Sequence, residues 1–259
     1  MKSRVFSWLL IPGPDWRANL RVPQTGVRIF AYITLSQNLM YFRSVDYILL
    51  FTGFLVAYLL GSIPTAVWVG KWFYGIDVRN EGSGNAGATN TIRVLGVKAG
   101  IPVVIIDILK GYMAVWLMQF FIPESWSPET SIYMEIVAGL FAVVGHTLPV
   151  FAGFRGGKGV ATLLGVGIAL YGWAVLVSVV IFILAIILSK YVSLGSILAG
   201  IAFPLVVIFY FKETNPGLVG LSIFAAVFLL WTHRKNISRL LKGEEKRFSF
   251  RSSRKEDPN

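Results

Sequence analysis

The stretch EGSGNAGATNTIR, residues 81–93, combines small residues with hydrogen-bond donors. Glycine lets the backbone turn several N–H groups toward one point, as phosphate-binding loops do. Polar side chains add further donors: Ser83, Asn85, Thr89, Asn90 and Arg93. The loop is therefore predicted to surround an anion. The alternative is close packing of helices, which small residues alone favour.

A second glycine-rich loop, GFRGGKGVAT at 153–162, contains Arg155 and Lys158. We expect Lys158 and its neighbour Gly157 to contact phosphate, because a lysine among glycines exposes both charge and backbone N–H groups. The alternative is that the lysine stem only extends to the membrane surface. Since two such loops are expected on one membrane face, the anion-binding interpretation is favoured.

Two further turns supply polar side chains. YVSLGSI at 191–197 contains Ser193 and Ser196, and HRKNISRL at 233–240 contains His233 and Asn236. His233 and Asn236 are three positions apart, so on a helix they share a face. All four polar clusters are predicted to converge on the cytoplasmic side of the protein.

Several familiar patterns are excluded. GSGNAG at 82–87 fits G-x-G-x-x-G, but a dinucleotide-binding fold needs a preceding strand, and an apolar run of membrane-span length stands there instead. The second loop has Gly159 where a Walker A loop needs Ser or Thr. A His-x4-Asp dyad is also absent, because Phe151 and Ser238 occupy the positions five residues after the two histidines.

The composition indicates the surroundings of these loops. Hydrophobic residues make up 55% of the chain and charged residues 14%, which is typical of a membrane protein. The net charge of +11 then favours anionic lipids and phosphorylated ligands over nucleic acid. With no cysteine and two histidines, neither a metal nor another cofactor is expected.

Apolar runs of bilayer length predict an all-α polytopic bundle. We expect about seven transmembrane helices, at 47–70, 101–122, 132–151, 159–171, 173–189, 191–211 and 217–232. The fourth is short, and a fused helix over 159–189 is the competing interpretation, which would reverse the orientation of everything downstream. If 159–171 and 173–189 are separate helices, Lys and Arg gather in alternate loops. Because cytoplasmic loops are enriched in Lys and Arg, the N-terminus is then expected outside and the C-terminus in the cytoplasm.

Three regions are predicted along the chain: an atypical N-terminal extension at 1–45, an integral-membrane domain at 46–245, and a basic polar cytoplasmic tail at 246–259. The extension contains six basic residues that would lie outside, against the positive-inside rule. Two explanations stay open for it: translation that starts at Met40, or an arm that lies on the membrane surface.

Ionisable residues also fall within the predicted spans, where such groups are functional by default. Asp107 and Lys110 are three apart and able to pair on one helix face, so a purely structural ion pair is the alternative. Glu135 lies near the outer end of the third span. His146, near its inner end, is expected to be a structural donor.

The chain resembles the bacterial acyl-phosphate:glycerol-3-phosphate acyltransferase family, PlsY, from about residue 47 to 245. The resemblance rests on long ordered motifs: GSIPTA at 61–66, GSGNAGATNTIRVLG at 82–96, DILKG at 107–111, GHTLPVFAGFRGGKGVAT at 145–162 and HRKNISRLLKGEE at 233–245. It implies a seven-span enzyme of the bacterial inner membrane. The implied reaction transfers a fatty acyl group from acyl phosphate to the 1-position of sn-glycerol 3-phosphate, giving lysophosphatidic acid and phosphate.

The resemblance also implies roles for particular residues. The expected catalytic residues are Ser83, Lys158, Ser196, His233 and Asn236, with Ser193 as the less favoured alternative to Ser196. The expected phosphate-binding residues are Arg93 and Lys158 and, from the composition of the two loops, Asn85, Asn90 and Gly157. Arg155 departs from the family, which usually has Lys there, and this change keeps the charge. Functional coupling to an enzyme that produces acyl phosphate is a further expectation.

An acyl phosphate is a reactive mixed anhydride, so the enzyme mainly has to orient substrates and stabilise anions. No Ser-His-Asp set of recognisable spacing is present. We therefore hypothesise that a phosphate oxygen of a bound substrate takes the hydroxyl proton, while His233 positions groups. Small residues at Gly61 and at 165–167 are expected to leave room for the acyl chain. The alternative function is a membrane carrier for a small phosphorylated metabolite, although no internal repeat is visible.

Overall fold

A computed structural model of the protein describes residues 44–248. These residues form helices and connecting loops without any strand, which confirms the all-helical class. Most of the predicted extension at 1–45 and of the predicted tail at 246–259 lies outside the described residues.

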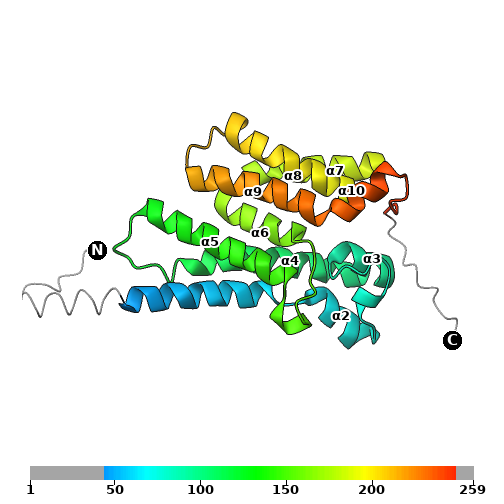
Figure 1. The fold of residues 1–259 in the computed structure, drawn as a ribbon, viewed down its shortest axis with the longest axis horizontal. Helices are drawn as coiled ribbons and strands as arrows, with labels where there is room; N and C mark the ends of the chain where they lie inside the picture. Colours follow the sequence, from blue (N-terminus) through cyan, green and yellow to red (C-terminus); the bar gives the residue numbers. More distant parts are fainter. Residues whose placement is uncertain (1–43, 249–259) are drawn as a thin grey trace, which may run out of the picture. The chain divides into compact units, whose positions relative to one another are not determined.

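The long helices run alongside one another (Figure 1), and α6 lies between two groups of them. On one side α6 packs against α4 and α5, and on the other against α7 and α9. The long helices in chain order are Ser44–Gly61, α4 (Val97–Met118), α5 (Pro128–Thr147), α7 (Ala174–Ser189), α8 (Val192–Leu205) and α9 (Pro216–Thr232), with α6 spanning Val160–Tyr171. Shorter elements at one end are α2 (Thr65–Tyr74), η2 (Val78–Asn80), α3 (Ala88–Leu95), η3 (Val150–Ala152) and α10 (Arg234–Leu241), and η4 (Val206–Tyr210) continues α8.

Four segments among the described residues are long and apolar enough to cross a membrane: Ser44–Gly61, Val97–Met118, Pro128–Ala152 and Val192–Tyr210. A fifth is added if α9 and α10, bent by 60° relative to one another, form one broken span. Helices α6 and α7, of 12 and 16 residues, are apolar but shorter than a full span. The number seven therefore stays a prediction.

Two helix breaks test the predicted span at 47–70 and the choice between separate and fused helices over 159–189. The predicted span at 47–70 is wrong, because the first helix ends at Gly61 and α2 begins only at Thr65. Pro64 explains the break, since proline lacks an N–H and disfavours helical backbone in the residue before it. Between α6 and α7, Gly172 adopts a positive φ of 52°. The interpretation of two separate helices over 159–189 is thus confirmed.

Glycines let helix backbones touch at two crossings. A Cβ added to Gly165 of α6 would collide with the carbonyl of Ile108, and one on Gly111 of α4 would collide with that of Thr162. Gly61 packs in the same way against Ala142. The expectation that Gly61 and Gly165 leave room for an acyl chain is therefore wrong, because the α5 and α4 backbones fill those spaces. Small residues drive close helix packing here.

A buried polar cluster ties α2, α4 and α5 together. Lys110 Nζ lies 2.9 Å from Asp107 Oδ1 and donates a hydrogen bond of 2.9 Å to the carbonyl of Ile63. The Thr65 hydroxyl donates to Asp107 Oδ1 at 3.2 Å, and His146 Nδ1 lies 3.8 Å from the same oxygen. Both members of the ion pair are buried. The predicted pairing of Asp107 with Lys110 is confirmed.

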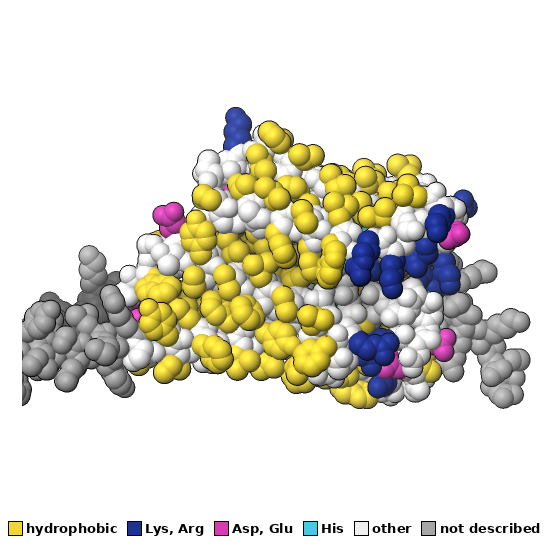
Figure 2. All heavy atoms as spheres, in the orientation of Figure 1, with side chains coloured by type: hydrophobic (Ala, Val, Ile, Leu, Met, Phe, Trp, Pro, Cys, Tyr) yellow, Lys and Arg dark blue, Asp and Glu magenta, His cyan; other side chains and the backbone are white. Residues whose placement is uncertain are grey.

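The surface separates charge from hydrophobic area. Figure 2 shows hydrophobic side chains along the length of the helices, while most of the visible Lys and Arg side chains gather at the end that contains α2, α3 and α10. The same end carries the two glycine-rich loops that the sequence singles out, since η2 and α3 flank the first and η3 and α6 flank the second. The fold thus brings the predicted anion-binding loops to one end of the bundle.

Candidate active site

The first loop is held in shape by Asn90. Its side-chain carbonyl accepts hydrogen bonds from Ser83 N at 2.7 Å and Ser83 Oγ at 3.0 Å. Its amide group donates to the carbonyls of Val78, at 2.7 Å, and Glu81, at 3.1 Å. Gly82, at φ 64°, approaches Asn90 so closely that a Cβ would collide with it. One buried amide therefore fixes the turn that presents Ser83.

The second loop is fixed from two sides. Gly157 N donates to the carbonyl of His146 at 3.1 Å, and its Cα packs against the His146 ring, leaving no room for a Cβ. From η2, Arg79 Nη1 donates to the carbonyls of Ala152, at 2.6 Å, and Arg155, at 3.3 Å. Arg79 is itself held by both carboxylate oxygens of Asp77. The Asp77–Arg79 pair thus links the segment before the first loop to the second loop.

Lys158 follows the anchored glycines and extends toward α10. Its Nζ donates a short hydrogen bond to the Asn236 side-chain carbonyl. Next to it, His233 begins the turn from α9 into α10, and its Nδ1 lies 2.9 Å from the Leu229 carbonyl. Because a carbonyl only accepts, that nitrogen carries a proton and the other ring nitrogen remains for further contacts.

Glu245, in the segment after α10, forms hydrogen bonds with side chains of α8 and α10. Its Oε1 accepts hydrogen bonds from Ser193 Oγ at 2.7 Å and Asn236 Nδ2 at 2.6 Å, and its Oε2 accepts one from Arg239 Nε at 2.7 Å. Three residues later, Phe248 N donates to the Lys190 carbonyl at 2.7 Å. The segment after α10 therefore lies across the turn between α7 and α8.

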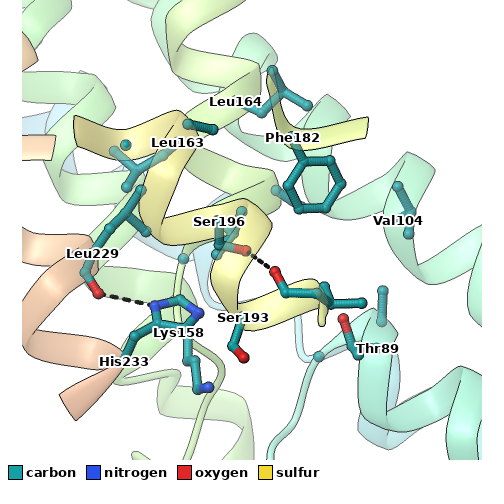
Figure 3. A pocket seen from close by; sticks show the side chains of 18 of the residues that line it. Thr89, Val104, Lys158, Leu163, Leu164, Phe182, Ser193, Ser196, Leu229 and His233 are labelled. Carbon is teal, nitrogen blue, oxygen red and sulfur yellow. Dashed lines mark hydrogen bonds between the residues drawn. The ribbon is translucent and has the colours of Figure 1, made fainter. Parts of the chain in front are cut away.

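One cavity of about 570 Å³ connects these groups to an apolar interior. Its polar lining comes from both loops, α8, α10 and the following segment, and includes Ser83, Asn85, Arg93, Lys158, Ser193, Ser196, His233, Asn236, Arg239 and Glu245. Its apolar lining comes from α4, α6, α7, α8 and α9. Figure 3 shows Lys158, Ser193 and His233 near one end, and Leu164, Phe182 and Val104 farther along.

A cavity with cations and amides at one end and aliphatic side chains along the rest suits a molecule with an anionic head and an acyl tail. The family profile described as glycerol-3-phosphate acyltransferase matches residues 51–243. The chain belongs to the glycerol-3-phosphate acyltransferase family. That match contains every polar residue of the cavity named above except Glu245.

Individual members of the glycerol-3-phosphate acyltransferase family are similar over most of their length. The protein of that name from Chlorobaculum tepidum is 46% identical over 219 residues, covering 75% of this chain and 94% of the relative. The one from Fusobacterium nucleatum is 43% identical over 201 residues, covering 77% and 98%.

Solved structures of an acyltransferase of this family share the fold. Crystal structures of PlsY, an integral membrane glycerol 3-phosphate acyltransferase, in its glycerol 3-phosphate and lysophosphatidic acid forms, are 38% identical to this chain. They superpose with TM-scores of 0.67 and 0.66, and each matches 96% of the PlsY chain and 77% or 78% of this one. The resemblance seen in the motifs is confirmed.

The acyltransferase fold brings most of the predicted site residues to the cavity. Ser83, Asn85, Arg93, Lys158, Ser196, His233 and Asn236 all line it. Asn90 and Gly157 do not line it directly. Their contacts place Asn90 within the first loop and Gly157 against His146, so each shapes a loop wall.

The charges in the cavity influence one another. Burial lowers the pKa of Lys158 to about 8; Glu245 opposes this shift, while Arg239 and Arg93 add to it. Burial also lowers the pKa of Arg93. Burial of Glu245 acts to raise its pKa, but hydrogen bonds from Arg239, Asn236 and Ser193 outweigh it, so the pKa lies below the ordinary value. The cavity therefore concentrates positive charge around one carboxylate.

Reasoning from the sequence missed Glu245 and Arg79. Glu245 stands in the quoted segment HRKNISRLLKGEE, and an acid at the end of a basic helix was the available signal. Arg79 is an ordinary loop residue by pattern, and only its contacts with the second loop identify it. Among the described residues, no group of three or more His, Asp or Glu side chains is arranged to bind a metal ion.

Proposed function

We propose that this protein transfers a fatty acyl group from acyl phosphate to the 1-position of sn-glycerol 3-phosphate, producing lysophosphatidic acid and phosphate. The observation that carries the proposal is the single cavity in which Arg93 and Lys158 meet an apolar channel. Membership of the family, and the glycerol 3-phosphate and lysophosphatidic acid forms of its solved relative, support the same acceptor and product.

In the proposed reaction, the 1-hydroxyl oxygen of glycerol 3-phosphate attacks the acyl carbon. The bond between that carbon and the bridging phosphate oxygen breaks, and the phosphate leaves with the electron pair. The hydroxyl proton passes to a phosphate oxygen of a bound substrate. Because phosphate takes up this proton, atoms and charges balance without a protein base.

The side chains then orient and stabilise. Arg93 and Lys158, both half-buried, hold phosphate oxygens, because cations form strong charge-assisted hydrogen bonds with them. Ser83, Ser196 and Asn236 orient the reacting carbonyl and hydroxyl groups, and Asn85 adds an amide to the anion site. Asn90 and Gly157 keep the two loop backbones in place. Preorganised donors of this kind lower the barrier most where charge develops.

His233 has a positioning role in this scheme. Its Nδ1 is used in the hydrogen bond to the Leu229 carbonyl, which fixes the ring against α9. If His233→Ala abolished turnover while the affinity for both substrates stayed unchanged, the proposed transfer of the proton to the substrate would lose its support.

The proposed orientation places the N-terminus outside and the C-terminus in the cytoplasm of the bacterial inner membrane, with about seven spans. It is supported by the basic side chains at the end with α3 and α10, since cytoplasmic loops are enriched in Lys and Arg. The site would then face the cytoplasm, where an enzyme that produces acyl phosphate is the expected functional partner.

The experiment is an acyl-transfer assay on the purified full chain in detergent. Palmitoyl phosphate with glycerol 3-phosphate should give equal amounts of phosphate and 1-acyl lysophosphatidic acid, with palmitoyl coenzyme A as the control donor. Mass spectrometry of the product decides the acylated position. A folded protein that uses only the coenzyme A donor would refute the proposed donor, and one that forms no lysophosphatidic acid would refute the activity.

A further inference from the structure

Three helices carry the apolar lining of the cavity away from its polar groups. Along them, the lining residues farthest in sequence from the polar groups are Gly167 of α6, Val175 of α7 and Phe203 of α8. Ser193 lies at the other end of α8, beside the polar groups. At about 1.5 Å per helical residue, Phe203 is roughly 15 Å farther along the same helix. The cavity therefore runs down α8, from the charged groups to an aromatic ring.

Phe203 is held from behind by Tyr171. The two rings meet edge to face, with centroids 4.9 Å apart and planes at 75°. This is a favoured aromatic geometry. Tyr171 ends α6, and its hydroxyl donates a hydrogen bond of 2.6 Å to the carbonyl of Leu218 at the start of α9. A ring anchored to the α9 backbone thus supports the Phe203 ring.

The wall beside this ring is also tight. A Cβ on Gly167 would lie 2.9 Å from Val175 Cγ2, so α6 and α7 touch there. Val175 itself is buried. Since packed interiors do not yield easily to added volume, a chain that reaches this point meets a wall formed by the contact of Gly167 with the Val175 side chain and by the packing of Phe203 on Tyr171.

We propose that Phe203, supported by Tyr171, is the floor of the acyl channel and limits the length of the acyl chain that the enzyme accepts. This proposal rests on the proposed function, because it takes the acyl chain as the occupant of the apolar lining. The continuity of that lining with the Lys158 and Ser196 end supports this occupant, since a chain attached to a phosphate bound there enters the channel directly.

The test measures kcat/KM of the purified full chain for acyl phosphates from twelve to twenty carbons. Phe203→Ala removes the ring from the floor, and Phe203→Leu removes less of it. Tyr171→Phe keeps both rings and removes only the bond to Leu218. The matched control is Phe209→Ala, because Phe209 of η4 is 72% exposed and does not line the cavity.

Phe203→Ala should move the preferred donor to a longer chain. The ratio of kcat/KM for the longest donor to that for the wild-type optimum should rise on the order of tenfold or more, because a hydrophobic pocket discriminates about that strongly per methylene. Phe203→Leu should shift the preference less, Tyr171→Phe should broaden it, and Phe209→Ala should retain the wild-type profile. Thermal unfolding of each variant confirms that it is folded.

If folded Phe203→Ala or Phe203→Leu kept the wild-type dependence of kcat/KM on donor length, Phe203 would not be the floor of the channel. With an active wild type, the proposed function would still stand. The chain would then leave the channel before it reaches α8 Phe203. A wild-type protein that uses no acyl phosphate of any length would reject the proposed function and this inference together. The two failures are thus distinguished by the wild-type measurement.

Discussion

Removal of Lys110 should destabilise the protein more than removal of its whole ion pair. Lys110 Nζ lies 2.9 Å from Asp107 Oδ1, and each side chain is 3% exposed. At an effective dielectric constant of about 20, the attraction at this distance is roughly 6 kcal/mol before desolvation is subtracted. Lys110→Met leaves the carboxylate buried without its counter-ion, and such a loss costs about 3–5 kcal/mol.

The double variant Asp107→Asn with Lys110→Met removes both charges and keeps a side-chain oxygen to accept the Thr65 hydroxyl. Replacement of a buried pair by neutral groups is often close to neutral, so the double variant should recover most of the loss. For a chain of this size, about 3–5 kcal/mol corresponds to a fall in the unfolding midpoint of roughly 6–20 °C in the single variant.

The assay is thermal unfolding of the purified variants in one detergent, with Lys98→Met as the control. Lys98 lies on the same helix but is exposed, so its replacement should leave the midpoint within the error of the wild type. Unfolding of Lys110→Met at the wild-type temperature, or a double variant no more stable than the single one, would refute the predicted cost of leaving Asp107 without its counter-ion.

Three further predictions follow from the contacts. Since the Lys158 cation is present below its pKa of about 8 and is lost above it, kcat/KM for glycerol 3-phosphate should fall as the pH rises through about 8; a flat profile to higher pH would contradict this. Arg79→Gln removes two hydrogen bonds to the second loop and should raise KM for glycerol 3-phosphate about tenfold, and Arg79→Lys should restore only part of the wild-type KM. Equal kinetics in the wild type and both variants would exclude a role of Arg79 in positioning that loop. Gly165→Ala forces a Cβ into the Ile108 carbonyl and should lower stability by about 1–3 kcal/mol, whereas Gly220→Ala, where the added Cβ meets open space, should not.

Helices with continuous apolar sequences were predictable, because burial in lipid dominates their free energy. The predicted runs at 101–122, 132–151 and 217–232 correspond to α4, α5 and α9 within a few residues. The predicted first span, 47–70, is too long. Apolar residues continue past Pro64, and hydropathy alone does not reveal that proline lacks a backbone N–H. Local backbone chemistry, rather than hydrophobicity, ends that helix.

The cavity lining was predictable from residue type, but its supports were not. Arg93 and Lys158 combine charge with glycine-rich surroundings, and both line the cavity. Asn90 has the same polar character as Asn85, yet its side chain donates to the carbonyls of Val78 and Glu81. Glu245 is brought to Ser193 by a turn after α10 that has no hydrophobic pattern. Such long-range contacts depend on tertiary packing, which a single sequence does not display.

We propose that two loops distant in sequence place Arg93 and Lys158 in one anion site. The most direct measurement is calorimetric titration of glycerol 3-phosphate into purified wild type, Arg93→Gln, Lys158→Gln and the double variant, with Arg234→Gln as control. Arg234 is a basic residue of α10 that stacks on Trp231 and does not line the cavity.

Each single variant should lose about tenfold or more in affinity, since a charge-assisted hydrogen bond contributes about 1.5–3 kcal/mol. The double variant should lose less than the product of the two single losses if both cations hold the same phosphate, while Arg234→Gln binds as the wild type does. Single variants that bind glycerol 3-phosphate as tightly as the wild type and the control would contradict a shared anion site.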